Sequence, residues 1–378
     1  MSEPVIVAYG RSAVCRAKNG GFSGIHPLEW TAETLKGVLN KAPQLELSEI
    51  DDIILGCARH ENMCNRNMAR LLSLRAGLPY SVPGQTINRF CSSGLQAIAT
   101  GANSISAGEA DVIIAGGTEQ MSMKLTRGEN DNDAWLEENE PGAYMAMGTT
   151  AENVAAKYNV TREEMDEFSV HSHLKAAEAQ RKGQLGRSII PLNIGDKVVD
   201  RDEGIRAESN VEALARLKPC FVENGRVTAA TSSQTSDGAA FVVLMSRDKA
   251  EKLGIKPIAR LVKFAATGCD PEYMGMGPVF AVPRVMERSG MDIDQMDVIE
   301  LNEAFAAQSI PCIRLLKLPR EKVNPWGGAI ALGHPMGATG AVLTCKALDY
   351  LIENNGRFGL VTMCIGGGMG AAGILELL

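Results

Sequence analysis

A cysteine at the start of a predicted helix is the first candidate for chemistry in this sequence. Residues 88–94 (NRFCSSG) lead an extended run into Cys91 and then, through small residues, into a helical pattern. Free backbone N–H groups and the positive end of a helix dipole favour a thiolate there, which is the nucleophilic form of cysteine. Cysteines are also common as buried structural residues, so this segment alone leaves a nucleophile and a structural thiol equally open.

A histidine lies in a glycine-rich run at residues 327–340 (GGAIALGHPMGATG), immediately before another helical pattern. Histidine is the side chain that most readily exchanges a proton near neutral pH, and Pro335 stiffens the backbone after it. Glycine-rich loops also bind phosphates, but neither the P-loop pattern nor the dinucleotide pattern follows a predicted strand here. The run therefore favours His334 as a proton-transfer group.

Two further predicted strands have candidate residues at their ends: Cys364 is the last residue of one, and Asn302 directly follows the other. Cys364 opens the turn at residues 363–370 (MCIGGGMG), where backbone N–H groups could point at a developing oxyanion. A tight strand connection with an incidental thiol explains this segment equally well. Asn302, in residues 301–308 (LNEAFAAQ), could hold a water or polarise a carbonyl, although capping of the next helix is the simpler interpretation.

The other cysteines and histidines show no ligand pattern. The nine cysteines contain no CxxC pair, which argues against a zinc site and against a disulfide framework and favours reduced thiols in a cytoplasm. His171 and His173 lie in a charged helical segment and are expected to be solvated. His26 and His60 lack a partner pattern. We therefore expect no metal site.

These residues need a framework of sheets and helices. Short apolar runs typical of buried strands alternate with patterns typical of helices, which predicts an α/β protein with helices covering its sheets. The expected strands are Val5–Tyr9, Ile53–Leu55, Val112–Ala115, Val298–Leu301 and Leu360–Cys364, and the expected helices include Thr31–Asn40, Ser93–Ala107 and Gly340–Asn354.

The sequence also indicates an internal duplication. Residues 47–55 resemble residues 293–301 at an offset of 246, and residues 113–117 resemble residues 363–367 at an offset of 250. Near-equal offsets favour two similar halves over a chance similarity of buried strands. We predict a first half at 1–118 and 233–255, an inserted domain at 119–232, and a second half at 256–378.

The predicted insertion is more charged than either half. Its acidic stretch at residues 129–140 is expected to be a solvated loop. Residues 150–184 are amphipathic, and Thr161 and Glu164 in this segment are spaced as a helix capping box.

Composition sets outer limits on function. The chain has 378 residues with 38 basic and 45 acidic side chains, a net charge of −7, and 45% hydrophobic residues, which excludes a disordered chain and argues against a nucleic-acid partner. The N-terminal segment does not read as a signal peptide. The uncharged run at residues 360–375 is too short for a membrane span and contains five glycines.

The four motifs together resemble those of the thiolase family, in the family's order and over nearly the whole chain. The resemblance implies a five-layered αβαβα core made of two similar halves, with a loop domain inserted in the first. It implies that Cys91 attacks an acyl thioester while His334 takes its proton, and that Cys364 is the acid and base at the carbon beside the thioester carbonyl. One oxyanion hole would comprise His334 and a water held by Asn302, and the other the N–H groups of Cys91 and Gly366.

The resemblance also implies that coenzyme A binds as a substrate, with no metal or redox cofactor. Residues 228–239 (TAATSSQTSDGA) match the family's pantetheine-binding segment. The expected CoA and substrate contacts are Ser233, Ala229, Lys218, Met147, Phe305, Ala304 and Met274. A homodimer or homotetramer is implied as well.

Two features favour the degradative 3-ketoacyl-CoA thiolases within this family. Biosynthetic acetoacetyl-CoA thiolases have a histidine before the Met-Gly pair, where this chain has Ala146, and the SSQTSDG run is closer to the degradative branch. We therefore expect longer or bulkier acyl chains. The alternatives are a biosynthetic acetoacetyl-CoA thiolase, a decarboxylating condensing enzyme, and a non-catalytic subunit that binds acyl-CoA or lipid.

Overall fold

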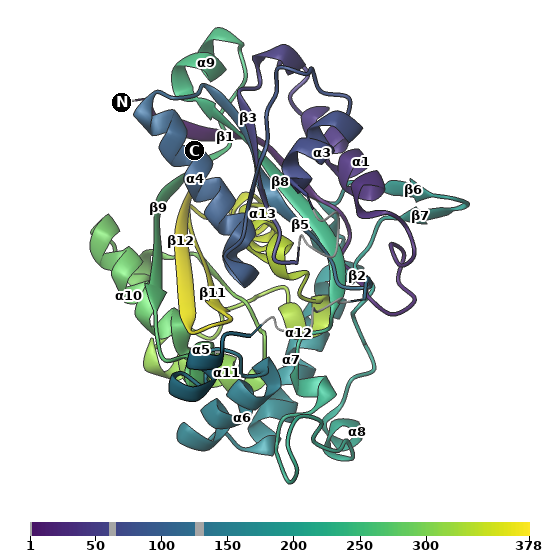
Figure 1. Cartoon of the computed structure of the whole chain (residues 1–378), viewed down its shortest axis with the longest axis vertical. Helices are drawn as coiled ribbons and strands as arrows, with labels where there is room; N and C mark the ends of the chain where they lie inside the picture. Colours follow the sequence, from purple (N-terminus) through teal and green to yellow (C-terminus); the bar gives the residue numbers. More distant parts are fainter. Residues whose placement is uncertain (1, 60–65, 125–131) are drawn as a thin grey trace.

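The chain builds two half-sheets with the same order of strands (Figure 1). A computed structural model describes residues 2–59, 66–124 and 132–378. From one outer edge to the other, the strands are β4 (Gln85–Ile87), β3 (Asp52–Gly56), β5 (Val112–Gln120), β8 (Ser236–Ser246), β1 (Pro4–Arg11), β9 (Ala259–Gly268), β12 (Met369–Leu377), β11 (Phe358–Ile365) and β10 (Val298–Leu301). β1 and β9 join the halves through Ile6 and Ala259, and the short β2 (Cys15–Arg16) pairs with β8.

The strand directions confirm the duplication. In the first half β1, β8 and β5 pair antiparallel, and β3 and β4 follow in parallel; in the second half β9, β12 and β11 pair antiparallel, and β10 follows in parallel. A parallel bridge from Ile299 to Val323 occupies the position that β4 holds in the first half.

The register corrects one of the two predicted offsets. Asp52 pairs with Ile113, and Val298 pairs with Gly359, so both strand pairs repeat at an offset of 246. The structural counterpart of Ile113 is therefore Gly359, and the offset of 250 is wrong by four residues. The two Gly-Gly pairs are not structural counterparts, because Gly116 and Gly117 lie inside β5 whereas residues 366 and 367 form the turn after β11.

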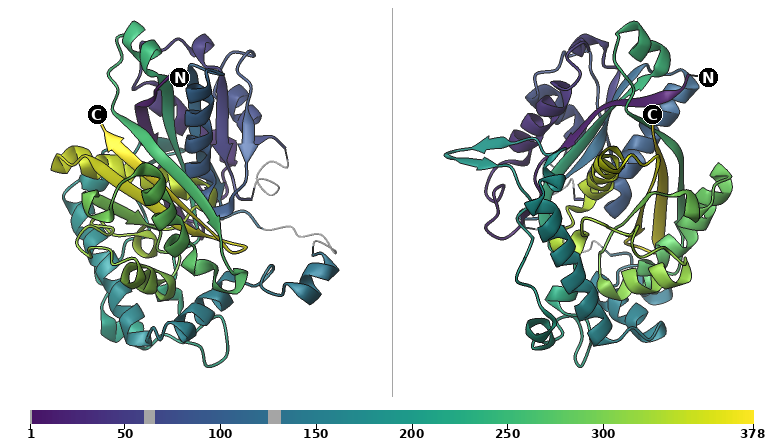
Figure 2. Two further views of the ribbon diagram at one scale, coloured as in Figure 1. Left: turned by 90° about the vertical axis from the view of Figure 1, so that its left-hand side faces the viewer. Right: turned by 180° about the vertical axis from the view of Figure 1, so that it is seen from behind.

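Helices form three layers that alternate with the two half-sheets, as Figures 1 and 2 show. α1 (Pro27–Leu39) and α3 (Met68–Arg75) cover the outer face of the first half, and α10 (Gly277–Ser289) covers the outer face of the second. α4 (Ser93–Ala107) and α13 (Met336–Asn354) lie between the half-sheets. Buried side chains form three large apolar clusters, one beneath each outer helix layer and one around the two central helices. The predicted αβαβα architecture is confirmed.

The two central helices approach each other through glycines. A Cβ on Gly94 of α4 would lie 2.9 Å from the backbone nitrogen of Ala341, and a Cβ on Gly340 of α13 would lie 2.5 Å from that of Leu95. Only glycine permits such backbone contact. The packing brings the N-termini of α4 and α13 together, and Cys91 and His334 immediately precede those ends.

The segment between β5 and β8 contains most of the predicted insertion. It carries α5 (Ala134–Asn139), α6 (Met147–Lys157), α7 (Arg162–Arg181), the hairpin of β6 (Leu192–Ile194) and β7 (Lys197–Val199), and α8 (Val211–Ala215). α6 and α7 pack against α11 (Ala306–Leu315), and α7 also packs against α12 (Ala329–Leu332). The remaining helix, α9 (Arg247–Lys252), follows β8. The boundaries at residues 118, 232 and 255 stay a prediction, and β5 itself continues to Gln120.

Three local expectations can be checked in this segment. The capping box is confirmed, since the Thr161 hydroxyl accepts a hydrogen bond from the Glu164 N–H and the Glu164 carboxylate accepts one from the Thr161 N–H. His171 is exposed, but His173 is buried, and its Nδ1 accepts the Arg206 N–H at 3.1 Å, so the solvated assignment of His173 is wrong. The described part of the acidic stretch forms the exposed helix α5 rather than a loop; residues 129–131 lie outside the described residues.

Two further observations bear on location. Across the described ranges, no helix is long and apolar enough to cross a bilayer. The described cysteines form no disulfide with one another, and Cys64, like His60, lies outside the described residues.

Candidate active site

Cys91 lies in a strained turn that hydrogen bonds hold in place. The turn is a single 3-10 turn, Phe90–Ser92, directly before α4. Phe90 has a φ of 42°, which lies in the left-handed region that residues other than glycine rarely adopt. The Asn88 Oδ1 accepts the Phe90 N–H at 2.8 Å, and the Ser93 hydroxyl donates to the Phe90 carbonyl at 2.7 Å. Strain maintained by surrounding contacts is typical of functional sites.

His334 faces the Cys91 sulfur. Its Nε2 lies 3.3 Å from the Cys91 Sγ, and its Nδ1 lies 2.6 Å from the Thr339 hydroxyl oxygen. That hydroxyl donates its hydrogen to the Pro335 carbonyl at 3.0 Å, so its oxygen accepts the Nδ1–H of His334. This arrangement fixes the tautomer and leaves the Nε2 lone pair directed at the thiol.

The residue before His334 must be glycine, because the backbone there lies in close contact with Ser236. Gly333 has a φ of 107°, and a Cβ there would lie 2.2 Å from the Ser236 hydroxyl oxygen. Any side chain at this position would displace the loop that carries the imidazole.

Burial keeps the Cys91–His334 pair neutral, which corrects the expected thiolate. Burial raises the pKa of Cys91 to about 11, although hydrogen bonds from the N–H groups of Gly366 and of Cys91 itself lower it in part. Burial also lowers the pKa of His334 to about 4. The helix N-terminus therefore does not by itself make Cys91 a thiolate, and the Nε2 of His334 is placed to accept the proton of the thiol.

Cys364 lies in the same site, at the end of β11. Its side chain is buried, and the pKa of Cys364 is raised well above its usual range, first by burial and next by the nearby Cys91 and Cys312 thiols. Two residues later the Gly366 N–H donates to the Cys91 sulfur. The turn after β11 therefore brings a second thiol and a backbone donor to the nucleophile.

Asn302 belongs to this group and does not cap a helix. It follows β10, is fully buried, and places its Nδ2 3.5 Å from the His334 Nε2. Its Oδ1 has no hydrogen-bond partner among the described residues, so this oxygen is available to a water or a substrate. The N-cap of α11 is Phe305, which makes the capping interpretation of Asn302 wrong.

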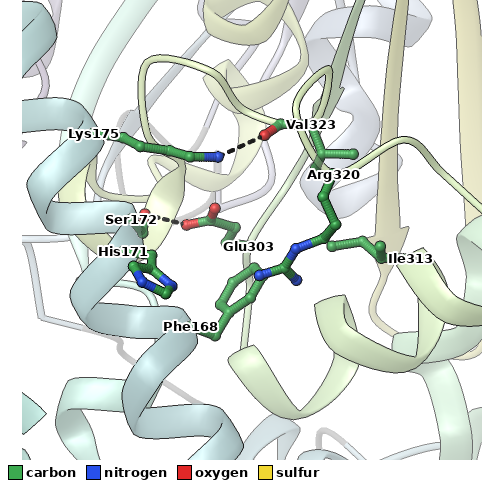
Figure 3. A pocket seen from close by; sticks show the side chains of 8 residues that line it. All are labelled: Phe168, His171, Ser172, Lys175, Glu303, Ile313, Arg320 and Val323. Carbon is green, nitrogen blue, oxygen red and sulfur yellow. Dashed lines mark hydrogen bonds between the residues drawn. The ribbon is translucent and has the colours of Figure 1, made fainter.

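The neighbour of Asn302 is a buried carboxylate that sequence reasoning missed. Figure 3 shows the Glu303 carboxylate directed at Ser172 of α7, whose hydroxyl donates to it at 2.6 Å. Asn324 donates to the other carboxylate oxygen at 2.8 Å and accepts the Leu301 N–H at 3.0 Å. The cavity beside these residues measures about 20 Å³, which is room for water and not for a substrate. We interpret Glu303 as a support for the loop of Asn302.

A larger cavity, of about 750 Å³, lies beside the segment 232–235. One wall is the segment 232–235, in which the Ser233 N–H donates to the Ala304 carbonyl at 2.9 Å and the Gln234 carbonyl accepts the His334 N–H at 3.0 Å. Three basic side chains also line it, namely Arg16, Lys18 and Arg206, and its lining contains no acidic residue. The cavity therefore combines positive charge with a wall whose backbone is hydrogen-bonded to Ala304 and His334.

The structure places most of the expected CoA contacts in or beside this cavity. Ser233 and Ala229 line it. Ala304 and Phe305 lie behind its wall, and the Phe305 ring packs edge-on against Phe221 with 5.9 Å between ring centroids. Lys218 is exposed and does not line the cavity.

Two methionines that were expected to contact the substrate, Met147 and Met274, lie beside the Gly366 turn and in the apolar cluster of Cys364. The Met147 Sδ is 3.4 Å from the position of a Cβ on Gly366, so it borders the turn that donates to Cys91. Met274 is buried in the same apolar cluster as Cys364.

Thr339 is the residue whose replacement most directly tests the tautomer assignment. We expect Thr339→Val to lower the rate of Cys91 acylation about 10- to 100-fold, because a buried Nδ1–H without an acceptor costs about 1–3 kcal/mol and frees the ring to turn. Thr339→Ser keeps the hydroxyl and is expected to retain most of the rate. Stopped-flow acylation by a 3-ketoacyl-CoA, the substrate that the family resemblance implies, measures the effect, and equal rates in the two variants would refute the assignment.

Across residues 2–59, 66–124 and 132–378, no cluster of three His, Cys, Asp or Glu side chains is arranged to hold a metal ion.

Comparisons with known proteins match one family over nearly the whole chain. The family model "Thiolase, N-terminal domain" matches residues 4–248, and "Thiolase, C-terminal domain" matches residues 255–377. The chain is 46% identical to a 3-ketoacyl-CoA thiolase of Bacillus subtilis, with all of both chains covered, and 42% identical to one of Idiomarina loihiensis, again with full coverage.

Solved structures show the same fold. The acetyl-CoA acetyltransferase of Bacillus anthracis superposes with a TM-score of 0.92 at 37% identity, covering 100% of this chain and 99% of that one. The dimeric peroxisomal thiolase of Saccharomyces cerevisiae also has a TM-score of 0.92, at 35% identity, covering 100% of this chain and 98% of that one. The chain belongs to the thiolase family.

Proposed function

We propose that the protein is an acyl-CoA C-acyltransferase that cleaves 3-ketoacyl-CoA with coenzyme A, as a 3-ketoacyl-CoA thiolase. The observation that carries the proposal is the contact of 3.3 Å between the Cys91 Sγ and the His334 Nε2, beside a second buried thiol and below a basic cavity. The names of the curated relatives support the same activity.

The first half-reaction breaks the carbon–carbon bond. The Cys91 sulfur attacks the 3-keto carbon while its proton moves to His334, and the bond between the 2- and 3-carbons then breaks. The acyl group stays on Cys91, and the carbanion of acetyl-CoA takes the proton of Cys364. Because burial makes an imidazolium costly, the proton moves to His334 only as negative charge forms beside it.

The second half-reaction releases the product. The Cys364 thiolate takes the proton of an incoming CoA thiol, which attacks the acyl group on Cys91. The Cys91 sulfur leaves and takes back its proton from His334. Every proton moved in the first half-reaction is returned in the second, so the free enzyme is regenerated without any other reactant.

Two oxyanions would be stabilised, one by backbone donors and the other by His334 after it has taken the Cys91 proton on Nε2. The N–H groups of Cys91 and Gly366 are directed at the reacting sulfur and would stabilise the oxyanion of the tetrahedral intermediate. His334 and a water held by Asn302 would stabilise the enolate of acetyl-CoA. Each such donor contributes about 3 kcal/mol to lowering the barrier.

The basic cavity supplies the binding site of the CoA moiety. Arg16, Lys18 and Arg206 line this cavity and would pair with the phosphates of CoA, and the pantetheine would run along the segment 232–235. CoA thioesters are thus the proposed ligands. We further propose a homodimer, supported by the dimeric yeast relative, that acts in fatty acid β-oxidation in the cytoplasm, supported by the bacterial relatives' names.

The alternatives are less well supported. A decarboxylating condensing enzyme pairs its cysteine with two histidines, or with a histidine and an asparagine, and has no use for Cys364 beside Cys91. A non-catalytic binding subunit has no need for a fixed tautomer at His334 or for the Gly366 donor. A thiolysis assay with CoA and a panel of 3-ketoacyl-CoA chains tests the proposal, and the absence of turnover with every chain would refute it.

Ala146 is the proposed determinant of chain length. It is exposed at the N-cap of α6, immediately before Met147, which borders Gly366. We expect the parent to prefer 3-ketopalmitoyl-CoA over acetoacetyl-CoA, and Ala146→His to shift the ratio of kcat/KM toward acetoacetyl-CoA by about 10-fold or more, because the larger polar ring fills the acyl path. Ala146→Ser is the matched control that adds polarity without bulk. Equal use of both chains by the parent would contradict the long-chain assignment.

A further inference from the structure

A buried carboxylate outside the reacting groups lies where the two halves meet behind the active site. Glu119, near the end of β5, is fully buried. One of its oxygens accepts the Ala58 N–H at 2.9 Å and the Gly337 N–H at 2.8 Å, and the other accepts the Arg59 N–H at 3.2 Å and contacts the Cys57 Sγ at 3.9 Å. Every one of these partners is a donor, so the site is built for a group that only accepts.

One set of these contacts connects Glu119 with the turn that carries Cys91. Ala58, which donates to Glu119, accepts the Asn88 side-chain amide with its carbonyl at 3.1 Å. The Oδ1 of the same Asn88 accepts the Phe90 N–H at 2.8 Å and so holds the strained turn of Cys91. The position of the sulfur therefore depends on the loop at residues 57–59, which Glu119 fixes.

The other contact, with the Gly337 N–H, connects Glu119 with the turn that carries His334. Gly337 lies in the first turn of α13, three residues after His334, and Thr339 in the same stretch accepts the imidazole Nδ1–H. A Cβ on Gly337 would lie 2.7 Å from the Ala58 nitrogen and 2.9 Å from a Glu119 oxygen, so the start of α13 rests directly on this loop and carboxylate. A negative charge at the N-terminus of a 19-residue helix is favourable.

We propose that Glu119 is a positioning residue for the reaction, which fixes the Cys91 turn of the first half and the His334 turn of the second half at reacting distance. Glu119 touches neither the substrate nor the reacting atoms. The proposal rests on the proposed function, because the pair it positions is the one that forms the acyl-enzyme.

Two opposing effects act on the pKa of the Glu119 carboxyl group. Burial raises the pKa of Glu119 to about 7, while the three backbone donors and Arg59 lower it. The ionisable groups that face it are Cys57, Arg59 and Cys91. A glutamine would fill the same volume but would present an NH₂ group to a site that contains only donors.

Glu119→Gln tests the proposal through acylation and binding measured separately. We expect the single-turnover acylation of Cys91 by a 3-ketoacyl-CoA to fall about 10- to 100-fold, as lost positioning of a reacting pair does, with the Kd for CoA within about twofold of the parent. Asp349→Asn is the matched control, because Asp349 is also buried and accepts hydrogen bonds from Tyr9 and Ser188 toward the far end of α13. It is expected to change the melting temperature and not the acylation rate.

Asn88→Asp keeps the test decisive where Glu119→Gln fails to fold. It retains the acceptor for the Phe90 N–H and removes the donor to Ala58, and a fall in acylation with CoA binding kept is again expected. An acylation rate within about twofold of the parent would overturn the proposal, as would a parallel loss of acylation and CoA binding that Asp349→Asn reproduces. Absence of thiolysis by the parent would instead refute the proposed function.

Discussion

Cys91→Ser is expected to lower the rate of thiolysis by about 10³-fold or more. A serine hydroxyl has a much higher pKa than a thiol, and the imidazole that would take its proton has a pKa lowered to about 4 by burial. The neutral pair that suffices for a thiol is therefore too weak for a hydroxyl. The measurement is the loss of 3-ketoacyl-CoA in the presence of CoA, for parent and variant at equal concentration.

The control for this prediction is binding. The hydroxyl is smaller than the thiol and leaves the basic cavity unchanged, so the Kd for CoA is expected to stay within about twofold. Thiolysis by Cys91→Ser at the parental rate would mean that the acyl group is carried elsewhere, and turnover in neither protein would indicate a binding subunit.

Cys364→Ala is expected to separate the two kinds of chemistry in the site. Exchange of solvent deuterium into the methyl group of acetyl-CoA needs a group that removes a proton from carbon, and we expect it to fall by about 10²- to 10⁴-fold. Exchange of labelled CoA with acetyl-CoA moves protons only between sulfur atoms and the imidazole, which give them up far more readily than carbon does, so it depends less on Cys364 and is expected to fall far less. Thiolysis, which needs both steps, is expected to follow the deuterium exchange.

Asn302→Ala provides a comparison for this variant. It weakens one oxyanion hole without removing either sulfur, so both exchange reactions continue, and deuterium exchange falls by about 10²-fold, the effect of one lost donor. If Cys364→Ala retained deuterium exchange at the parental rate, another group would have to be the base, and the assignment of Cys364 would be wrong.

The fold could be predicted from the sequence wherever a pattern is local. The strand Val298–Leu301 and the helix Ser93–Ala107 are confirmed at both ends, because apolar runs and a terminal glycine mark them. α13 begins at Met336, four residues before the expected start, because Gly337 and Gly340 lower helix propensity in isolation. The structure uses these glycines for close packing against α4, which no local pattern reveals.

The motifs predicted the residues of the site but not their protonation. The helix N-terminus before Gly94 suggested a thiolate at Cys91, whereas burial outweighs the dipole and raises the pKa of the thiol to about 11. The degree of burial depends on the second half-sheet, which comes from residues more than 200 positions away.

The basic residues of the cavity could not be found from the sequence. Arg16, Lys18 and Arg206 lie in two distant segments, and neither segment has a basic run. The folded chain alone brings them to one cavity. Glu119 was missed for a similar reason, because a single acid at the end of a buried strand has no signature until its four donors are assembled around it.

The central claim is that one sulfur carries the acyl group. Rapid acid quenching of the enzyme after mixing with a 3-ketoacyl-CoA in the absence of CoA, followed by mass spectrometry of its peptides, tests it most directly. The account predicts one acyl group per chain on the peptide that contains Cys91 and none on the peptide that contains Cys364. An acyl group on Cys364 or another residue, or no acylated peptide from an enzyme that performs thiolysis, would contradict it.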